Sequence, residues 1–163
     1  VGVMFAKYLI VFLVSMVPLI ELRGAIPYAI AFHLPLVPSY LIAIVGNMLP
    51  VPIIFFFARK VLEWGKDVSF KPFAKFCRFC IEKGERGKQK LLSKSKNGVY
   101  VALFLFVGIP LPGTGAWTGT LAASFLDLDF KKSVLAVVCG VVLAGIIMGL
   151  LSSGIFGAIS FIK

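Results

Sequence analysis

The sequence predicts an all-α integral membrane protein that is an inverted repeat of two units, each a re-entrant helical hairpin followed by a transmembrane helix. Three observations lead to this fold class: an apolar composition, long runs without charge, and clusters of proline and glycine inside two of those runs. Of the 163 residues, 60% are hydrophobic and 15% are charged, against about 25% charged in soluble domains. This composition excludes a soluble enzyme, a disordered chain and a secreted disulfide scaffold.

The runs without Asp, Glu, Lys or Arg cover residues 24–58, 97–126 and 133–162. A helix needs about 20 apolar residues to cross a bilayer. We therefore expect a single membrane domain over residues 1–163. Its parts in order are a hairpin at 8–34, a transmembrane helix at 39–58, a basic cytoplasmic loop with an amphipathic helix at 59–97, a second hairpin at 97–126, a transmembrane helix at 133–151 and a C-terminal segment at 152–163.

The first predicted hairpin has two apolar arms around a centre bounded by Pro18 and Pro27. Glu21 and Arg23 lie in this centre, where each proline removes a backbone N–H that a helix would use. The stretch also has features of a signal peptide, with Lys7 before an apolar run and an A-x-A string after it. The charges at positions 21 and 23 precede that string and argue against cleavage.

The first transmembrane helix carries Gly46 and Asn47, followed by Pro50 and Pro52. The prolines predict a kink in this helix. The Asn47 amide requires a hydrogen-bond partner inside the membrane.

The loop at 59–97 holds twelve Lys and Arg residues against four Asp and Glu residues, a net charge of +8. The positive-inside rule places such a loop in the cytoplasm. Nucleic-acid binding is the rival use of a basic run, and no other feature of the sequence supports it. Cys77 and Cys80 form a C-x-x-C pair without a second ligand pair, so we expect neither a metal nor a redox centre here.

Within this loop, aromatic residues recur at every third position with basic residues between them. The residues are Phe70, Phe73, Phe76 and Phe79, with Lys71, Lys75 and Arg78. On a helix these rings form a curved apolar stripe. Such a helix either lies in the cytoplasmic headgroup layer, where it favours anionic lipid, or packs on the base of the protein itself.

The run at 97–126 is too long for one straight transmembrane helix and too short for two helices with a turn. Its centre at 108–119 contains Pro110, Pro112 and four glycines, which no continuous helix tolerates. Non-helical backbone persists at membrane depth only where protein or a wet cavity surrounds it. The pattern predicts a re-entrant hairpin, with a single kinked crossing as the alternative.

The second transmembrane helix carries Gly140, Gly145 and Gly149, the last two forming a G-x-x-x-G motif. Small residues at this spacing permit close helix contact. The contact is either with one of the hairpins or with a second copy of the chain.

The order of elements has a topological consequence. A hairpin makes no net crossing of the bilayer and a transmembrane helix makes one, so the second unit is inverted relative to the first. With the basic loop in the cytoplasm, the first hairpin enters from outside and the second from inside, and the two tips meet near the midplane. Paired broken segments at corresponding places in two halves are the best sequence indication of a transport site.

The candidate substrate or proton site combines residues of both tips with the kinked helix. It consists of Glu21, Arg23, Gly24, Pro27, Asn47, Pro110, Pro112, Gly113, Thr114 and Gly115. Glu21 and Arg23 are the ionisable residues that this topology places deep in the membrane, where a charge is costly unless it is paired or hydrated. They either neutralise each other as a structural pair or form a working site.

In a working site, Arg23 and the free N–H groups at the start of each second arm would cradle an anion. Gly113 and Gly115 would let the backbone approach a ligand closely, and Thr114 would add a hydroxyl group. Glu21 could carry a proton, since burial favours its neutral form, whereas the nearby Arg23 favours its charged form.

No catalytic constellation accompanies these residues. The sequence has no Cys–His dyad, nucleophile elbow, histidine cluster or nucleotide-binding loop, so we expect no enzymatic activity and no cofactor. His33 is expected to be an interfacial polar residue, and Trp117 a packing or membrane-belt aromatic residue.

Three strings carry a resemblance to a known family: E-L-R-G-A-I-P at 21–27, G-N-M-L-P-V-P at 46–52 and P-L-P-G-T-G-A-W-T-G at 110–119. In this order they resemble the Putative small multi-drug export protein family. That family resembles the DedA superfamily of prokaryotic membrane proteins, whose paired re-entrant hairpins face each other. DedA-type proteins are implicated in moving lipid-linked phosphates, notably undecaprenyl phosphate, and in proton-dependent drug resistance. The resemblance implies that Glu21 and Arg23 are the acidic and basic positions of the first hairpin and that residues 110–115 are the second tip.

Three functions remain open at this point, and the first is favoured. It is a secondary transporter or lipid translocase of the prokaryotic inner membrane that moves an amphipathic lipid-phosphate-type anion, with proton coupling as an option. The second is export of cationic drugs with Glu21 as the counter-charge, and the third is a membrane scaffold or assembly factor. The expected partners are membrane lipids, a lipid-phosphate or drug substrate and, through the glycine motif, a second copy of the chain.

Overall fold

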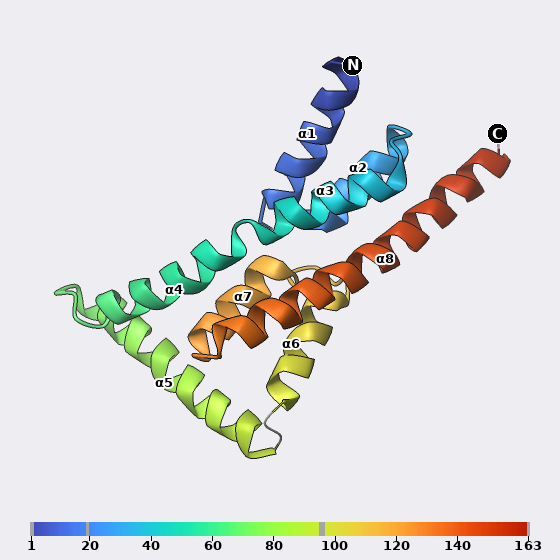
Figure 1. Cartoon of the computed structure of the whole chain (residues 1–163). Helices are drawn as coiled ribbons and strands as arrows, with labels where there is room; N and C mark the ends of the chain where they lie inside the picture. The colour runs from blue at the N-terminus through green and yellow to red at the C-terminus, as the bar shows by residue number, and fades with distance from the viewer. Residues whose placement is uncertain (1, 19, 95–96, 163) are drawn as a thin grey trace.

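The computed structural model describes residues 2–18, 20–94 and 97–162, with the side chains of residues 91–92, 94 and 155–162 outside that description. Within these ranges every regular element is an α-helix (Figure 1). The helices are α1 (Gly2–Met16), α2 (Glu21–Ala31), α3 (Leu36–Met48), α4 (Val51–Gly65), α5 (Lys71–Lys94), α6 (Gly98–Gly108), α7 (Ala116–Phe125) and α8 (Phe130–Ile162). Two segments, Leu36–Gly65 and Phe130–Gly154, are long and apolar enough to cross a membrane.

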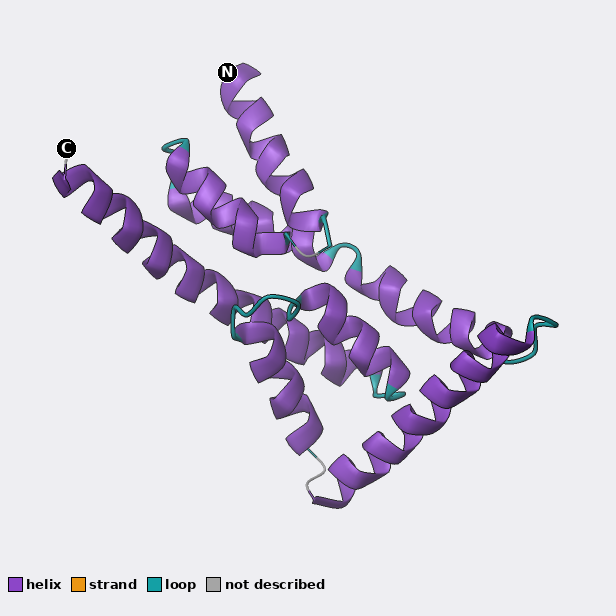
Figure 2. Cartoon of the chain, turned by 180° about the vertical axis from the view of Figure 1, so that it is seen from behind, coloured by secondary structure: helices purple, strands orange, loops and turns teal. Residues whose placement is uncertain are grey.

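Four of the helices form two helical hairpins. Hairpin 1 consists of α1 and α2 around break 1 (residues 17–20), and the Lys7 ammonium near its start lies 5.4 Å from the centre of the Phe32 ring at its end. Hairpin 2 consists of α6 and α7 around break 2 (residues 109–115). Tyr100 at its start accepts a hydrogen bond from the backbone N–H of Asp129 just after its end (3.2 Å). In hairpin 2 the chain therefore reverses direction and does not form a single kinked helix (Figures 1 and 2).

The second helix of each hairpin ends in the same capping motif. α2 is followed by His33 in the left-handed region (φ 54°) and α7 by Asp127 (φ 51°). The next residue in each case, Leu34 or Leu128, donates its N–H to a carbonyl five residues earlier, at 2.9 Å and 3.0 Å. Both leucines are buried, as the hydrophobic contact of a Schellman motif requires. The chain thus leaves both hairpins in the same way.

The helix after hairpin 1 is interrupted, whereas the helix after hairpin 2 is continuous. α3 and α4 are separated by Leu49 and Pro50, which confirms the predicted kink. Pro50 and Pro52 lack the N–H groups that a continuous helix would use there. α8 extends at both ends beyond the expected 133–151 and includes residues 152–162.

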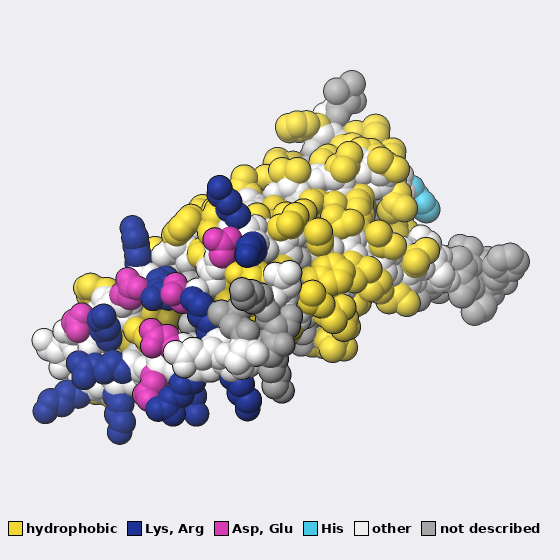
Figure 3. Space-filling model, turned by 60° about the horizontal axis from the view of Figure 1, so that its bottom comes forward, with side chains coloured by type: hydrophobic (Ala, Val, Ile, Leu, Met, Phe, Trp, Pro, Cys, Tyr) yellow, Lys and Arg dark blue, Asp and Glu magenta, His cyan; other side chains and the backbone are white. Residues whose placement is uncertain are grey.

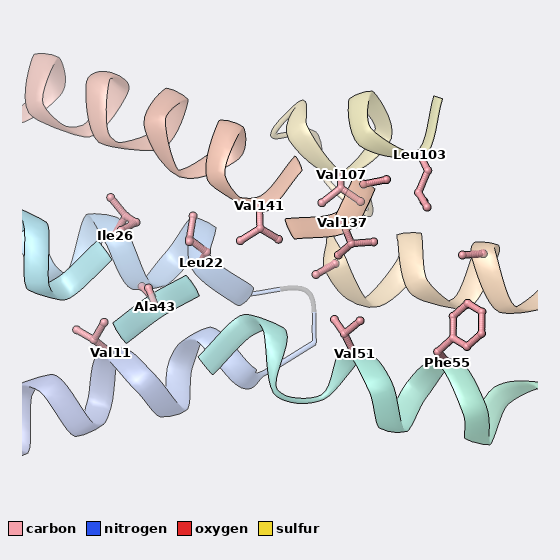
Figure 4. Close-up of a cluster of buried hydrophobic side chains, with 14 of the residues drawn as sticks. Val11, Leu22, Ile26, Ala43, Val51, Phe55, Leu103, Val107, Val137 and Val141 are labelled. Carbon is pink, nitrogen blue, oxygen red and sulfur yellow. The ribbon is translucent and has the colours of Figure 1, made fainter. Parts of the chain in front are cut away.

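The packing of the helices follows one rule in both units. The first helix of each hairpin packs against the next long helix of its own unit, α1 against α3 and α6 against α8. The second helix packs against the long helix of the other unit, α2 against α8 and α7 against α4. Figure 4 shows core side chains from these elements, including Leu22 of α2, Val51 of α4, Val107 of α6 and Val137 of α8. Each unit is therefore completed by a helix of the other, and the two breaks lie in the middle of the molecule.

Two corresponding helix contacts are so close that they require a glycine. A Cβ on Gly46 of α3 would lie 2.1 Å from Ser15 Oγ of α1. A Cβ on Gly140 of α8 would lie 2.7 Å from the Val107 Cβ of α6. The first glycine of α8 therefore seats hairpin 2, which is one of the two roles predicted for the glycines of this helix.

The charged side chains gather at one end of the molecule. α4 continues beyond the expected end at 58 to Gly65, and α5 then lies across this end and leads to α6 (Figure 1). Figure 3 shows the charges there, next to a largely hydrophobic surface. Asp127 ties this end together because it binds Arg59 of α4 at 2.5 Å and Lys88 of α5 at 3.3 Å. Hairpin 2 therefore begins and ends at the charged end, while hairpin 1 begins at the opposite end (Figure 1).

Candidate functional site

The candidate site is the contact between the two breaks. Break 2 contains Gly113 (φ 80°) and Gly115 (φ 151°), whose backbone favours glycine. Directly after break 1, Glu21 has a φ of 51°, a conformation that costs a non-glycine residue about 1–3 kcal/mol. Such strain persists only where the surrounding contacts hold the residue in place. For Glu21, those contacts are made with the residues that follow break 2.

Arg23 of α2 binds carbonyl oxygens at the end of α6 and in break 2. Its guanidinium donates hydrogen bonds to the carbonyls of Leu111, Ile109 (3.3 Å) and Val107 (3.4 Å), and to Thr114 Oγ1 (2.7 Å). The last carbonyls of a helix have no partner within it and carry partial negative charge, which a cation stabilises. Arg23 therefore caps α6 from the other hairpin.

The Glu21 carboxylate binds the start of α7. Its Oε2 accepts a hydrogen bond from the Ala116 N–H at 3.1 Å, and its Oε1 accepts one from the Trp117 N–H at 3.0 Å. Glu21 is only 3% exposed. The start of a helix offers unpaired N–H groups and the positive end of the helix dipole, so it can hold a buried carboxylate without a cation. Glu21 thus replaces the cap that Gly115, which has no side chain, cannot provide.

Within the described residues, Glu21 and Arg23 form no salt bridge with each other. The two charges are each bound by groups of hairpin 2. Whether they act as a structural pair or as a working site stays a prediction. The prediction of free N–H groups at the start of α7 is wrong, since Glu21 occupies two of them. The two side chains together hold both ends of break 2.

Gly115 and Thr114 lie in this contact. A Cβ on Gly115 would lie 2.2 Å from Glu21 Oε2, so the carboxylate reaches α7 only because this residue is glycine. Thr114 Oγ1 lies 2.9 Å from two carbonyl oxygens of its own break, which holds it in position for Arg23. The other predicted residues of the hairpins are Pro27 within α2 and Pro110, Pro112 and Gly113 in break 2.

Gly24 and Asn47 have different surroundings. A Cβ on Gly24 would lie 2.4 Å from the Ile20 side chain of break 1. Asn47 at the end of α3 is 2% exposed, and its Oδ1 has no hydrogen-bond partner among the described residues. Thr120 of α7 and Ser133 of α8, which the sequence did not single out, also have buried and unpaired hydroxyl oxygens. A buried polar atom without a protein partner is a position where a water molecule or a ligand is expected.

Trp117 connects the two breaks in a way that the sequence did not indicate. Its indole Nε1 donates a hydrogen bond to the Met16 carbonyl at the end of α1 (3.1 Å), and its backbone N–H binds Glu21. The predicted role was that of a packing or belt aromatic. The only signal in the sequence was its position in the first turn after the break, where the two hairpins meet.

The predicted membrane-surface residues lie on α5 or directly before it, and they are exposed. They are Phe70, Phe73, Phe76 and Phe79, with Lys71, Lys75 and Arg78. α5 packs on the protein through small residues instead, since Ala74 and Cys77 are buried and Cys77 Sγ would lie 2.5 Å from a Cβ on Gly65 of α4. α5 therefore packs on the base of the protein, as one of the two alternatives predicts. Its phenylalanines are exposed, and their placement in the headgroup layer stays a prediction.

Comparison with known proteins gives a match at the level of the family. A family model described as "Putative small multi-drug export protein" matches residues 21–147. The matched range covers most of the chain and includes Glu21, Arg23 and break 2. No curated protein and no solved structure matches the chain.

Proposed function

We propose that this chain, which belongs to the Putative small multi-drug export protein family, is a multi-pass transporter of the prokaryotic cytoplasmic membrane. Its two apolar segments of spanning length suit that location. The substrate we propose is an amphipathic anion of the lipid-phosphate type, as the resemblance to the DedA superfamily also implies. The observation that carries this proposal is the contact of Glu21 and Arg23 with both ends of break 2.

In this proposal the two units are inverted in the membrane and both hairpins are re-entrant. The supporting observation is that the hairpins begin at opposite ends of the molecule and their breaks meet between them (Figure 1). The basic charge of α5 favours the cytoplasm for its end. Irregular backbone is tolerated in a membrane where protein surrounds it, and transporters place their substrate sites at such broken helices.

An anionic headgroup fits this contact because the guanidinium of Arg23 forms no salt bridge in the described residues. We expect the anion to bind Arg23 and to replace Glu21 at the N–H groups of Ala116 and Trp117. Helix N-termini bind phosphate through such groups and through the helix dipole. The headgroup would then take the position that the Glu21 carboxylate holds in the structure.

Protonation of Glu21 is the proposed trigger for this exchange. A neutral carboxyl group accepts weaker hydrogen bonds than a carboxylate, so a proton loosens the contact with α7 and frees its N–H groups. The proton and the anion then bind together, and their release restores the contact. Movement of the anion is thereby coupled to movement of a proton.

A cationic drug is the second candidate substrate, favoured by the family description and by the aromatic residues near the site. Trp117 lies next to Glu21 and lines an apolar groove together with Phe57 and Phe76. Aromatic faces attract cations. In this alternative Glu21 is the counter-charge of the drug, and Arg23 opposes binding.

Two substitutions in proteoliposomes distinguish these candidates. The probes are a fluorescent phosphatidic acid and ethidium, each followed across the bilayer with and without a pH gradient. We expect Arg23→Gln to slow the transport of phosphatidic acid across the bilayer at least about tenfold, since a hydrogen bond to a charged group contributes about 1.5–3 kcal/mol. Glu21→Gln should abolish the response to the pH gradient. Lys131→Gln, which changes an exposed basic residue outside the contact, is the matched control and should behave like the unmodified protein.

Other outcomes decide between the alternatives. Faster ethidium export by Arg23→Gln, with phosphatidic acid transport absent throughout, would favour the cationic drug. A protein that moves neither probe, and whose Arg23→Gln variant only unfolds at a lower temperature, would be a scaffold. A Glu21→Gln variant with an unchanged pH response would remove proton coupling from the proposal.

A further inference from the structure

α5 has three distinct sides along its length. One side packs on the protein, where a Cβ on Gly84 would lie 2.1 Å from the Phe125 carbonyl oxygen of α7. On a second side, Phe76 and Phe79 are 59% and 56% exposed. The third side carries Lys71, Lys75 and Arg78, with Phe79 and Glu82 next to them. A helix with separate apolar and cationic sides suits the surface of an anionic membrane.

Phe73, Phe76 and Cys77 of α5 form one wall of an apolar groove whose other walls are α4 and α7. The groove has a volume of about 370 Å³, and every residue that lines it is hydrophobic. Phe57 and Val61 of α4 and Phe76 of α5 belong to its lining. Lys71, Lys75 and Arg78 line a separate hollow on a different side of α5, and none of them lines the groove. The groove therefore fits an apolar chain, and the positive charge of α5 favours a chain that belongs to an anionic lipid.

This groove leads from α5 to the contact between the breaks. Along α7 it is lined by Phe125, Leu121 and Trp117, which are spaced four residues apart and therefore share one face of the helix. Phe125 lies against α5, whereas Trp117 bonds Glu21 through its N–H and Met16 through its indole. The groove thus follows the whole of α7 and ends at the candidate site.

We propose that this groove binds one acyl chain of an anionic phospholipid from the cytoplasmic leaflet, and that the positive charge of α5 attracts the headgroup. The charge of α5 supports an anionic lipid, since this helix carries eight Lys and Arg residues against two Glu residues. If the transport function proposed above is correct, on which this step rests, the groove is the route by which a lipid substrate reaches break 2.

The test is photocrosslinking of the purified full chain in nanodiscs that contain phosphatidylglycerol with a diazirine in its acyl chain. We expect the label on Phe57, Phe76 and Leu121 to exceed that on Ile53, which is 66% exposed on α4 but does not line the groove. Ala58→Trp, which fills the groove, should reduce groove labelling about tenfold. The reason is that the acyl chain of the lipid can then bury about two fewer methylene groups in the groove. Ile53→Trp is the matched control and should leave groove labelling unchanged. A phosphatidylcholine probe with the same acyl diazirine should label the groove about tenfold less, because the attraction of each basic residue to anionic lipid contributes about 1 kcal/mol.

Three results would overturn this inference. They are equal labelling of the groove and Ile53, equal labelling by the two lipids, and crosslinks through the groove to a second copy of the chain. Arg23→Gln separates this inference from the proposed function, because it should slow transport at least about tenfold and preserve groove labelling. Groove labelling in a protein that transports neither probe would refute the transport proposal alone.

Discussion

At the scale of single residues, Glu21 and Arg23 cap a break that belongs to another hairpin. A helix is usually capped by the residue directly before it, but α7 is preceded by Gly115, which has no side chain. The carboxylate supplies the missing partner for two N–H groups of α7, and the guanidinium binds the Val107 carbonyl of α6 and the Leu111 carbonyl of break 2. The order of break 2 therefore depends on the position of hairpin 1, and any ligand that displaces either side chain will act on both hairpins.

Gly115→Ala should disrupt this contact. The new Cβ would lie 2.2 Å from Glu21 Oε2, and the φ of 151° is a conformation that alanine rarely adopts. We expect a loss of about 1–3 kcal/mol from the backbone strain alone, with a further loss because Glu21 is pushed from α7. Thermal unfolding in detergent measures this effect.

Gly113→Ala is the matched control for this prediction. Gly113 also has a positive φ, of 80°, but a Cβ there meets nothing within 4 Å. Gly113→Ala should therefore lose stability through backbone strain alone, without displacement of Glu21. Equal destabilisation by the two substitutions would contradict the importance of the Glu21 contact with α7.

The Cys80 thiol should react slowly with maleimide at neutral pH. Burial raises the pKa of this thiol, and the neighbouring Cys77 adds to the increase. A raised pKa lowers the fraction of reactive thiolate at pH 7, so the rate should lie below that of glutathione and rise as the pH increases. The measurement is maleimide labelling against pH in a Cys139→Ser background. A rate above that of glutathione would reveal an activated thiol and revive a redox role for the C-x-x-C pair.

At the scale of elements, the glycines of α8 have different roles. Gly145 faces the Tyr40 ring of α3, and a Cβ there would lie 2.3 Å from it. Tyr40 cannot easily move away, because its hydroxyl donates a hydrogen bond to the Val142 carbonyl. Gly149, the second glycine of the G-x-x-x-G motif, has nothing within 4 Å of a Cβ. Of the two glycines of this motif, Gly149 is therefore the one that leaves open space for a second copy of the chain.

Gly145→Ala should destabilise the protein by about 1–3 kcal/mol, the usual cost of forcing an extra methyl group into a packed contact. Gly149→Ala should change the unfolding free energy by less than about 0.5 kcal/mol, as substitutions away from packed contacts do. Chemical denaturation in detergent compares the two variants. Equal costs would contradict the placement of Tyr40 against α8.

The positions where the helices break were predicted from the sequence better than the contacts between distant helices. The prolines and glycines of break 2 indicated where the helix stops, and Pro50 and Pro52 indicated the kink between α3 and α4, since these effects are local. The capping of α7 by Glu21 and the bond from Trp117 to Met16 were not predicted. These contacts join residues that are far apart in the chain, and no local pattern records which distant N–H group a carboxylate will meet.

At the scale of the whole molecule, the two hairpins begin at opposite ends, and the charged residues gather at the end where hairpin 2 begins. The end formed by α5 holds most of the basic residues (Figure 3), and the connection from α7 to α8 lies at the same end because Asp127 binds Lys88. The start of α1 and the connection from α2 to α3 lie together at the other end, where Lys7 meets Phe32. This arrangement makes a definite prediction for the proposed inverted topology.

Single cysteines should label according to these two ends. In a chain whose three native cysteines are replaced by serine, Lys7→Cys and His33→Cys should react with an impermeant maleimide from outside. Lys83→Cys and Lys131→Cys should react only from the cytoplasmic side, because the basic end faces the cytoplasm. Right-side-out and inside-out vesicles measure the two accessibilities. Opposite sidedness for positions 7 and 33, or for positions 83 and 131, would refute re-entrant hairpins.

The ion pairs of Asp127 with Arg59 and Lys88 have a mechanical consequence. They link α4, α5 and the end of hairpin 2 into a base at the charged end of the molecule, whereas no ion pair links hairpin 1 to it in the described residues. If the molecule opens to release its cargo, hairpin 1 should swing while the base stays still. The gate would then lie on the face of the membrane opposite to α5.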